Sequence, residues 1–207
     1  MAVRAQQTRE LILTAAERLF AEHGVLAVSN RQISEAAGQG NNTAVGYHFG
    51  TKADLVRAVV RRHSEPIEQI RTRMLAELPD EPQLRDWVGC MVRPNPEYLG
   101  TLSTPTWYAR FGAQVMTDPV LRQIIVEEAM TSPQLQQVRN GLNTCLPAVP
   151  ASVRAERGEM ARHLIVHTCA EYERAVAAGE PTPSPTWSRL ATGLTDAITG
   201  LLLAPVS

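Results

Sequence analysis

The stretch SNRQISEAAGQGNNTAVGYHFGTKADLV, residues 29–56, decides how the first part of the chain folds. Ser29 stands three residues before Gln32, and Thr51 stands three residues before Asp54. In both pairs the hydroxyl side chain can accept a hydrogen bond from the first helical turn, while the other side chain reaches back to the backbone N–H of the capping residue. Each pair therefore predicts the start of a helix.

Two short helices are predicted in this stretch, over residues 29–37 and 41–48. Gly38 ends the first of them, because glycine readily adopts the left-handed conformation that closes many helices. The small side chains of Ala36 and Ala37 allow the second helix to cross the first closely. Two short helices joined by a tight glycine-containing turn are typical of a helix-turn-helix, whose second helix enters the major groove of DNA.

Polar side chains in this stretch supply the groups that recognition of DNA requires. Asparagine can pair with adenine through two hydrogen bonds, and a threonine methyl can contact the methyl group of thymine. Hydroxyl and imidazole groups can bind phosphates, and basic side chains add positive charge. A structural interpretation stays open, in which Asn41 and Thr51 only cap helices and Tyr47 belongs to the core. The predicted DNA contacts are Ser29, Arg31, Asn41, Asn42, Thr43, Gly46, Tyr47, His48, Thr51 and Lys52.

Helical periodicity continues along the rest of the chain. The first helix is predicted over residues 8–23, where apolar side chains recur at three- and four-residue spacing before Gly24. No run of alternating apolar and polar residues has the length of a strand, so the predicted fold class is all-α. Further helices are predicted over residues 51–63, 66–78, 80–92, 104–117, 119–131, 133–146, 151–178 and 185–203.

The chain is predicted to hold two domains. Residues 1–50 would form a three-helix, helix-turn-helix DNA-binding domain, and residues 51–207 a helical bundle for ligand binding and dimerisation, with helix 51–63 linking the two. Residues 1–63 hold eight Lys and Arg against five Asp and Glu, and the remainder holds 12 against 16, so +3 and −4 give the net charge of −1. A basic N-terminal part favours phosphate binding.

The composition favours a folded protein without membrane spans or disulfides. A hydrophobic fraction of 44% is typical of a folded chain rather than a disordered one. No window approaches the 18 or so apolar residues of a membrane span, and the opening MAVRAQQTRE lacks the apolar core of a signal peptide, so a cytoplasmic protein without membrane contact is expected. Cys90, Cys145 and Cys169 lie far apart without CxxC spacing, which favours small buried apolar residues over disulfides or metal ligands.

Residues 8–62 resemble the DNA-binding domain of TetR-family transcriptional regulators. The resemblance rests on AAERLFAEHG in the first predicted helix, then ISEAAG, then YHFGTKADLV. It implies a repressor that binds a (pseudo)palindromic double-stranded operator and is released by a small apolar or amphipathic effector. The segment between Gly38 and Phe49 is one residue longer than in the commonest version of the family, so Asn41 and Asn42 both stay candidates for reading a base.

The resemblance also implies a two-fold homodimer formed by the last two long helices. The sequence agrees, because helices 151–178 and 185–203 both carry long apolar stripes that can face a partner chain as well as their own core. Two chains joined in this way would place their recognition helices about one DNA turn apart.

Aromatic side chains gather in the segment TWYARFGAQVM, residues 106–116. An apolar pocket with a few polar anchors is the usual form of a small-molecule site, and here an arginine could anchor an acidic group. A core role for the aromatic residues, and a salt-bridged role for the arginine, stay open. The predicted ligand-binding residues are Trp87, Met91, Trp107, Tyr108, Arg110 and Phe111.

A polar stripe lies along helix 151–178, where Glu159, His163, His167 and Glu171 recur every four residues. Carboxylate and imidazole groups one helical turn apart can bind a metal ion. However, the three-residue spacing of di-iron bundles is absent, and no second helix carries matching ligands. A polar stripe at a dimer seam or on the solvent side explains the pattern equally well, and no metal, cofactor or catalytic residue is predicted.

Three functions compete at this point. The leading one is a dimeric, ligand-responsive repressor. An enzyme that uses the acidic and histidine stripe would contain metal, and it would leave the polar cluster at residues 41–52 unexplained. A DNA-binding protein without a ligand would not need so large a helical C-terminal part. Metal analysis distinguishes the enzyme from the repressor. A ligand-induced shift in melting temperature distinguishes the repressor from a DNA-binding protein that has no ligand.

Overall fold

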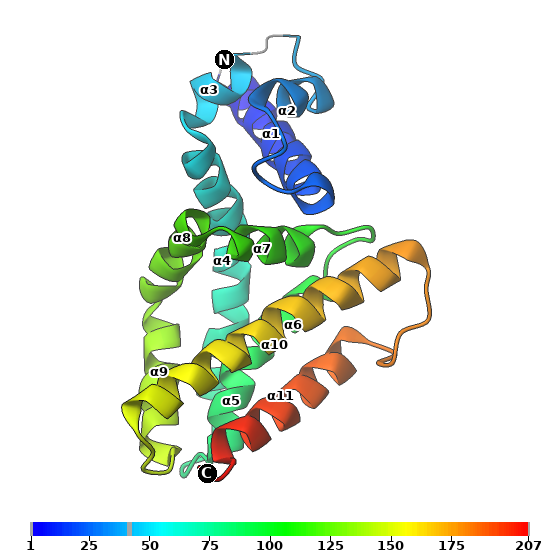
Figure 1. The fold of residues 1–207 in the computed structure, drawn as a ribbon. Helices are drawn as coiled ribbons and strands as arrows, with labels where there is room; N and C mark the ends of the chain where they lie inside the picture. The colour runs from blue at the N-terminus through cyan, green and yellow to red at the C-terminus, as the bar shows by residue number, and fades with distance from the viewer. Residues whose placement is uncertain (1, 41–42, 207) are drawn as a thin grey trace. The chain divides into compact units, whose positions relative to one another are not determined.

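The computed structural model describes residues 2–40 and 43–206. Within these ranges the chain forms eleven α-helices and no β-strand, so the all-α prediction is confirmed (Figure 1). None of the helices in the described ranges combines the length and the hydropathy that crossing a bilayer requires.

The first three helices form the predicted helix-turn-helix arrangement, with helix α1 at Ala2–His23, α2 at Asn30–Ala36 and α3 at Ala44–Phe49. Helix α1 begins at residue 2, so its predicted start at residue 8 is wrong. Gly24 ends α1 as predicted, with φ at 85° and its N–H donating to the carbonyl of Phe20 at 3.0 Å. The small core of these helices is mainly apolar, although Ser34 of α2 and Glu17 of α1 are also buried. Its most buried side chains are Ile12, Phe20, Val28, Ile33 and Val45.

Helix α4 runs from Lys52 to Ala76, so the predicted break between residues 63 and 66 is wrong. Pro66 lies inside this helix, where it removes one backbone donor and disfavours the helical conformation before it. Buried side chains stand on both sides of the proline, at Val60 and Ile67. Their packing outweighs the loss of a single helical hydrogen bond, and the helix continues.

The next three helices differ from the prediction, because α5 and α7 are shorter than predicted and α6 was not predicted. Helix α5 spans Leu84–Val92 rather than 80–92, because Gln83 and Asp86 cap it. Helix α6, Pro94–Leu99, was not predicted as a separate helix. Helix α7 spans Tyr108–Thr117, so it begins four residues later than residue 104, the predicted start.

The last four helices agree closely with prediction. Helix α8 spans Pro119–Met130, α9 spans Pro133–Cys145 and α10 spans Ala151–Ala178. Helix α11 spans Trp187–Leu203 and begins two residues later than predicted. The delay has a local cause: the side chain of Thr186 accepts a hydrogen bond from the backbone N–H of Arg189, so Thr186 is the capping residue.

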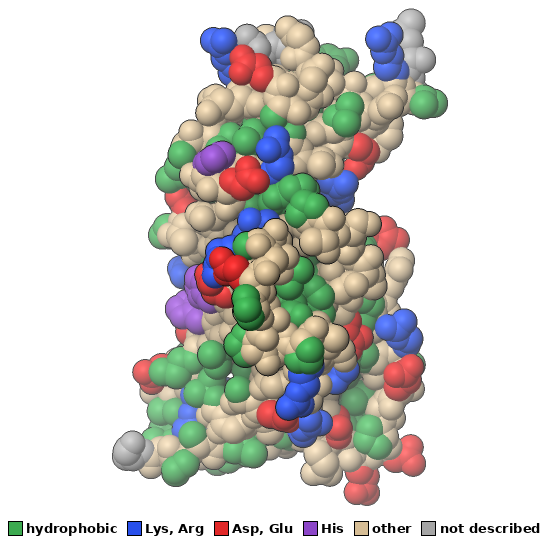
Figure 2. All heavy atoms as spheres, turned by 90° about the vertical axis from the view of Figure 1, so that its right-hand side faces the viewer, with side chains coloured by type: hydrophobic (Ala, Val, Ile, Leu, Met, Phe, Trp, Pro, Cys, Tyr) green, Lys and Arg blue, Asp and Glu red, His purple; other side chains and the backbone are tan. Residues whose placement is uncertain are grey.

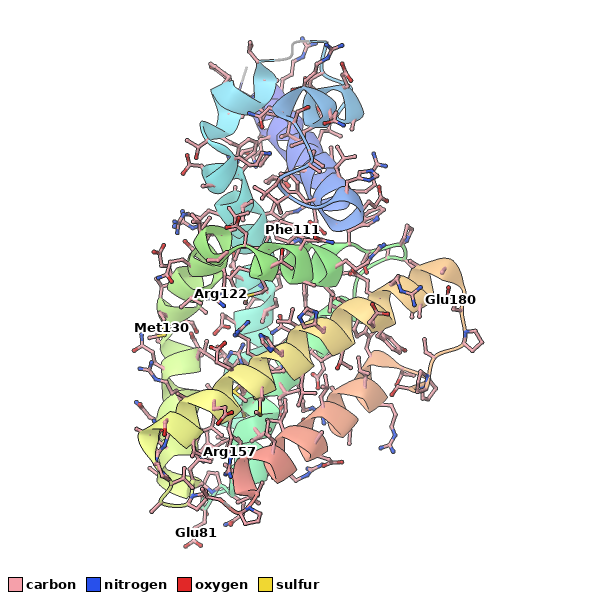
Figure 3. All side chains as sticks on the ribbon, viewed as in Figure 1. Glu81, Phe111, Arg122, Met130, Arg157 and Glu180 are labelled. Atoms are coloured by element: carbon pink, nitrogen blue, oxygen red, sulfur yellow. The ribbon has the colours of Figure 1, made fainter. Side chains whose placement is uncertain are left out.

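Helices α10 and α11 lie side by side and are joined at the end of α11 by a buried arginine (Figures 1 and 3). The guanidinium of Arg157 donates to the carbonyl of Leu202 at 3.0 Å and to that of Ala204 at 2.6 Å. These carbonyls belong to the helix C-terminus, where backbone acceptors lack helical partners and favour a positive charge. Arg157 therefore ties the start of α10 to the end of α11.

Two compact units can be distinguished by their internal contacts. One comprises Met1–Ser64 with Thr106–Ala129, and the other comprises Glu65–Pro105 with Met130–Ser207. This division differs from the predicted boundary at residue 50, because α7 packs on α1 in the first unit. The rings of Phe20 and Phe111 stack there with centroids 6.3 Å apart. The functional boundary at residue 50 stays a prediction.

Candidate DNA-binding site

Helix α2 begins with the capping box that the sequence predicts. The backbone N–H of Gln32 donates to the hydroxyl of Ser29 at 3.3 Å, and the backbone N–H of Ser29 donates to the side chain of Gln32 at 2.8 Å. Arg31 extends into solvent from the first turn and pairs with Glu35 at 2.7 Å. The hydrogen bond to Glu35 raises the pKa of Arg31. Both Ser29 and Arg31 are exposed, as DNA contacts must be.

Helix α3 is shorter than predicted and begins at Ala44, with Thr43 as its capping residue. The predicted base readers Asn41 and Asn42 lie outside the described residues. Ala44, Val45 and Phe49 are buried, so the opposite side of the helix faces outward. Three of the predicted contacts are exposed on that side: Thr43, Gly46 and Tyr47, the last with 85% of its surface exposed.

His48 is partly buried, and its ring stands edge-on to that of Tyr47 with centroids 5.1 Å apart. Its backbone carbonyl accepts a hydrogen bond from Arg9 of α1 at 3.2 Å. The same guanidinium lies 4.3 Å from the centre of the Phe49 ring, within the range of a cation–π interaction. Arg9 therefore holds the end of α3 against α1. This role was not predicted from the sequence, because the spacing of an isolated arginine does not indicate its partner.

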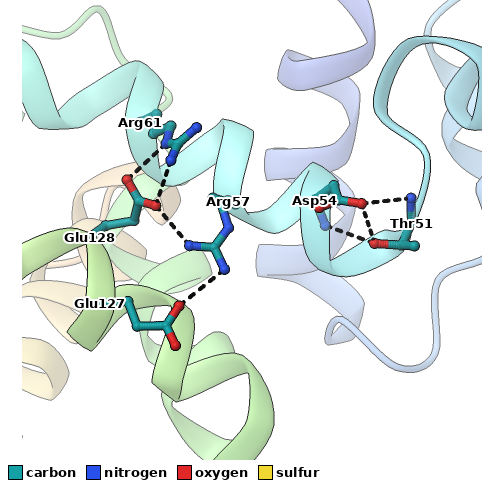
Figure 4. Close-up of polar contacts among 6 residues, drawn as sticks. All are labelled: Thr51, Asp54, Arg57, Arg61, Glu127 and Glu128. Atoms are coloured by element: carbon teal, nitrogen blue, oxygen red, sulfur yellow. Dashed lines mark hydrogen bonds and ion pairs between the residues drawn. The ribbon is translucent and has the colours of Figure 1, made fainter.

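Helix α4 begins with the second predicted capping pair. The carboxylate of Asp54 accepts hydrogen bonds from the Thr51 hydroxyl at 2.6 Å and from the Thr51 backbone N–H at 3.1 Å (Figure 4). These bonds, the hydroxyl bond first, lower the pKa of Asp54. Thr51 is exposed at the start of the helix, where it lies at the positive end of the helix dipole.

Lys52 differs from the other predicted contacts, because its ammonium group has partners within the protein. It donates to the carbonyl of Val28 at 2.7 Å and to that of Val25 at 3.0 Å. Both carbonyls belong to the turn between α1 and α2. Lys52 therefore holds this turn against the start of α4, and one of its three N–H donors remains for a phosphate.

Four charged side chains join α4 to α8 within the first unit, and we call them the arginine–glutamate cluster: Arg57, Arg61, Glu127 and Glu128 (Figure 4). Arg61 donates two hydrogen bonds to Glu128, at 2.8 and 3.0 Å. Arg57 donates to Glu128 at 2.8 Å and to Glu127 at 3.1 Å. The bond from Arg61, followed by that from Arg57, lowers the pKa of Glu128 although partial burial opposes this shift.

Several basic side chains of the first unit are thus paired with carboxylates. Arg31 pairs with Glu35, and Arg57 and Arg61 pair with Glu127 and Glu128. On the face shown in Figure 2, basic and acidic side chains are interspersed among the described residues. Affinity for DNA must therefore depend on placed hydrogen bonds as well as on net charge.

The predicted ligand residues of α7 belong mainly to a packed core. Phe111 is completely buried and stacks on Phe20, as described above. The ring of Tyr108 stacks on that of His63 with centroids 3.9 Å apart, and Trp107 packs against the same core. Arg110 donates to the carbonyl of Thr106 at 2.7 Å, one helical turn earlier. The core interpretation that the sequence left open therefore fits Trp107, Tyr108 and Phe111.

The other two predicted ligand residues, Trp87 and Met91, belong to α5 in the second unit. The indole ring of Trp87 covers Gly141 of α9 so closely that a Cβ atom there would lie 2.2 Å from the ring. The carbonyl of Met91 accepts a hydrogen bond from the buried Arg71 at 3.3 Å. Trp87 is thus a contact between two helices, and its neighbour requires glycine.

The stripe of Glu159, His163, His167 and Glu171 lies on the exposed side of α10. Glu159 and Glu171 form ion pairs with arginines one turn along the helix, Arg162 and Arg174. The rings of His163 and His167 stand 5.9 Å apart. Among the described residues, no three metal-binding side chains converge on one point.

The fold and the exposed edge of α2, α3 and α4 define a helix-turn-helix DNA-binding protein. Residues 12–59 match the family model described as bacterial regulatory proteins, tetR family. Residues 12–59 therefore form a TetR-family DNA-binding domain, as the sequence resemblance implied. This match supports a transcriptional regulator over the enzyme hypothesis.

Curated relatives match parts of the chain. The HTH-type transcriptional repressor AcnR of Corynebacterium glutamicum is 25% identical over 134 residues, covering 59% of this chain and 62% of AcnR. The HTH-type transcriptional regulator TtgR of Pseudomonas putida is 36% identical over 87 residues, covering 42% of this chain and 39% of TtgR. The matched regions therefore span less than two thirds of either relative.

A solved structure shares the whole fold. NalD, the secondary repressor of the MexAB-OprM multidrug efflux pump in Pseudomonas aeruginosa, aligns with a TM-score of 0.60 over 98% of this chain and 100% of the NalD chain. Sequence identity is 22%, so the likeness concerns the fold alone.

Proposed function

We propose that this protein is a ligand-responsive transcriptional repressor that binds double-stranded operator DNA as a homodimer. One observation carries the proposal. Polar side chains at the starts of α2 and α4 and along α3 are exposed together, while the apolar side chains of the same helices are buried. The exposed set comprises Ser29, Arg31, Thr43, Tyr47 and Thr51.

In the proposed complex α3 enters the major groove. Thr43 and the neighbouring Asn41 and Asn42 would contact base edges, and Gly46 would allow close approach to the duplex. Tyr47 and His48 would contact phosphates, as would the starts of α2 and α4 through Ser29 and Thr51. Lys52 would add one contact through its remaining donor. These contacts would orient the helix and read the sequence.

The proposed dimer forms through α10 and α11. Exposed apolar side chains support it, because Met160 and Leu164 on α10 and Leu203 on α11 would otherwise face water. A two-fold interface buries the same surface on both chains. Two recognition helices related by this axis would require a (pseudo)palindromic operator with half-sites about 34–36 Å apart.

Release from DNA is proposed to follow the binding of a small apolar or amphipathic ligand. An effector that binds better to the conformation unable to bind DNA lowers the affinity of the protein for its operator. The operator must lower the affinity for the effector by the same factor. Helix α4 is the proposed link, because its first turn belongs to the DNA-binding edge. The arginine–glutamate cluster would set the position of this helix. The protein is proposed to act in the cytoplasm.

Selection of bound sequences from a randomised DNA pool tests the proposal. The purified protein should enrich an inverted repeat, and Asn42→Ala should weaken binding to that repeat by roughly 1–3 kcal/mol without weakening binding to random DNA. Ser152→Ala, a change at an exposed position in the first turn of α10, serves as the matched control. No enriched sequence at low salt would contradict the proposal.

A further inference from the structure

We propose that a cavity beside Trp187 binds an uncharged aromatic or amphipathic small molecule. The proposal rests on the proposed regulation by a ligand and assigns it a place outside the predicted aromatic cluster. The cavity has a volume of about 720 Å³ and lies wholly within the second unit. Its walls come from α6 and the loop that follows it, from the end of α10 and from the start of α11.

Two aromatic rings form one wall of the cavity. Trp187 is the first residue of α11 and is half-buried, and its ring meets that of the buried Tyr172 edge to face, with centroids 4.5 Å apart. The backbone at Gly100 lies directly against Trp187, since a Cβ atom there would come within 3.2 Å of the Trp187 Cβ. An aromatic wall held from two sides provides the flat, rigid surface on which a ligand ring packs.

The polar groups around this wall are neutral or neutralised. Glu97 lines the cavity, but its carboxylate pairs with Arg93 at 2.8 Å. The Thr101 hydroxyl donates to the carbonyl of Tyr98 at 2.7 Å, so its oxygen remains an acceptor for a ligand. Ser188 lies at the wall formed by α11. A few hydroxyl groups over an apolar wall favour a ligand that is aromatic and uncharged.

A hollow in the first unit does not fit a ligand as well. It lies between α1, α3 and α4, and its lining includes Arg9, Arg57, Arg61 and Arg62. Carboxylates neutralise most of this charge, because Arg57 and Arg61 bind Glu128 and Arg62 lies 3.6 Å from Glu10. An anion would have to displace these partners. The cavity beside Trp187 requires no such exchange.

Fluorescence titration with the neutral dye N-phenyl-1-naphthylamine tests the proposal on the full chain. Saturable binding is expected. Ser188→Phe places a ring in the cavity and should weaken dye binding about ten-fold or more, about 1.4 kcal/mol, because the ring occupies volume that the dye needs. Ser152→Phe is the matched control, since both serines are exposed second residues of their helices. The control should bind the dye like wild type.

A second set of variants reports on the cavity through the fluorescence of Trp187 itself. Trp87→Phe with Trp107→Phe leaves Trp187 as the single tryptophan. Bound dye should quench its emission, and Ser188→Phe in this background should remove the quenching while the circular dichroism spectrum stays unchanged. Absent dye binding, or binding that Ser188→Phe leaves unchanged, overturns the proposal.

Operator binding measured with and without dye separates this proposal from the proposed function. Dye binding that Ser188→Phe removes, together with unchanged operator affinity, supports the cavity as a ligand site and contradicts its role in release from DNA. Failure to enrich any operator contradicts the proposed function, and the dye titration still decides whether the cavity binds its ligand class.

Discussion

Two groups of side chains in the first unit were predicted to bind partners because residues of one kind cluster in the sequence. The structure gives the two groups opposite surroundings. The polar group at the starts of α2 and α4 and along α3 is exposed, whereas the aromatic group of α7 lies in or against the core. Tyr47 and Phe111 mark the extremes, with 85% and 0% of their surfaces exposed. A polar cluster supported by caps can be placed from local sequence, but an aromatic cluster fits a pocket and a core equally well.

The largest effect on the free energy of unfolding is expected in the buried aromatic group of α7. Phe111→Ala should lower the free energy of unfolding by about 3–5 kcal/mol, because it removes a ring and leaves a cavity. Chemical denaturation followed by circular dichroism measures the change. If Phe111 instead served only as a ligand wall, stability would change little while ligand binding would be lost, and the comparison between the two groups would fail.

Lys52→Met tests a predicted DNA contact whose ammonium group is bonded within the protein. It keeps the aliphatic stem but leaves the carbonyls of Val25 and Val28 without their partner, so the free energy of unfolding should fall by about 1–3 kcal/mol. Denaturation of the free protein measures this loss. A residue that acted only on phosphate would instead leave stability unchanged and reduce the slope of log affinity against log salt by about one.

The arginine–glutamate cluster should contribute a smaller, pH-dependent amount. Glu128→Gln should cost about 1 kcal/mol near neutral pH, and Glu127→Gln should cost less because Glu127 accepts one ion pair rather than two. The pKa of Glu128 is lowered in the folded protein, so its contribution is present above the ordinary value of 4.5 and is lost as pH falls through the folded pKa.

Denaturation of wild type and Glu128→Gln at a series of pH values measures that contribution. The difference between the two proteins should shrink as the pH is lowered below the ordinary pKa of glutamate. A difference that stays constant across this range would show that the charge of Glu128 does not stabilise the junction of α4 and α8.

The smallest effect on the free energy of unfolding is expected at Tyr47, the most exposed of these side chains. Tyr47→Ala should change the free energy of unfolding by no more than about 0.5 kcal/mol, because the side chain contacts little. Its hydroxyl is proposed to bind phosphate, so binding to operator and to random DNA should weaken alike in a mobility-shift assay. Tyr47→Phe should reproduce most of this loss. A loss confined to the operator would make Tyr47 a base reader.

Prediction from sequence succeeded where structure depends on neighbours in the chain. The capping pairs at Ser29 and Thr51 formed as expected, and Gly24 and Gly38 adopt positive φ. It failed where distant packing outweighed a local rule. Pro66 did not end its helix, because buried residues on both sides hold it. The short helix α6 was missed, since prolines at both its start and its third position resemble a loop.

The sequence by itself determined the all-α class, the caps of α2 and α4, the limits of most of the last four helices and the resemblance of the N-terminal part to TetR-family regulators, because helix capping and apolar periodicity act over a few residues. Only the tertiary structure decided which side chains are available for binding. It buried Phe111 against Phe20, committed two donors of Lys52 to carbonyls of an earlier turn, and opened a cavity at Trp187. The physical reason is that burial depends on which segments meet in space, and residues such as Phe20 and Phe111 are far apart along the chain.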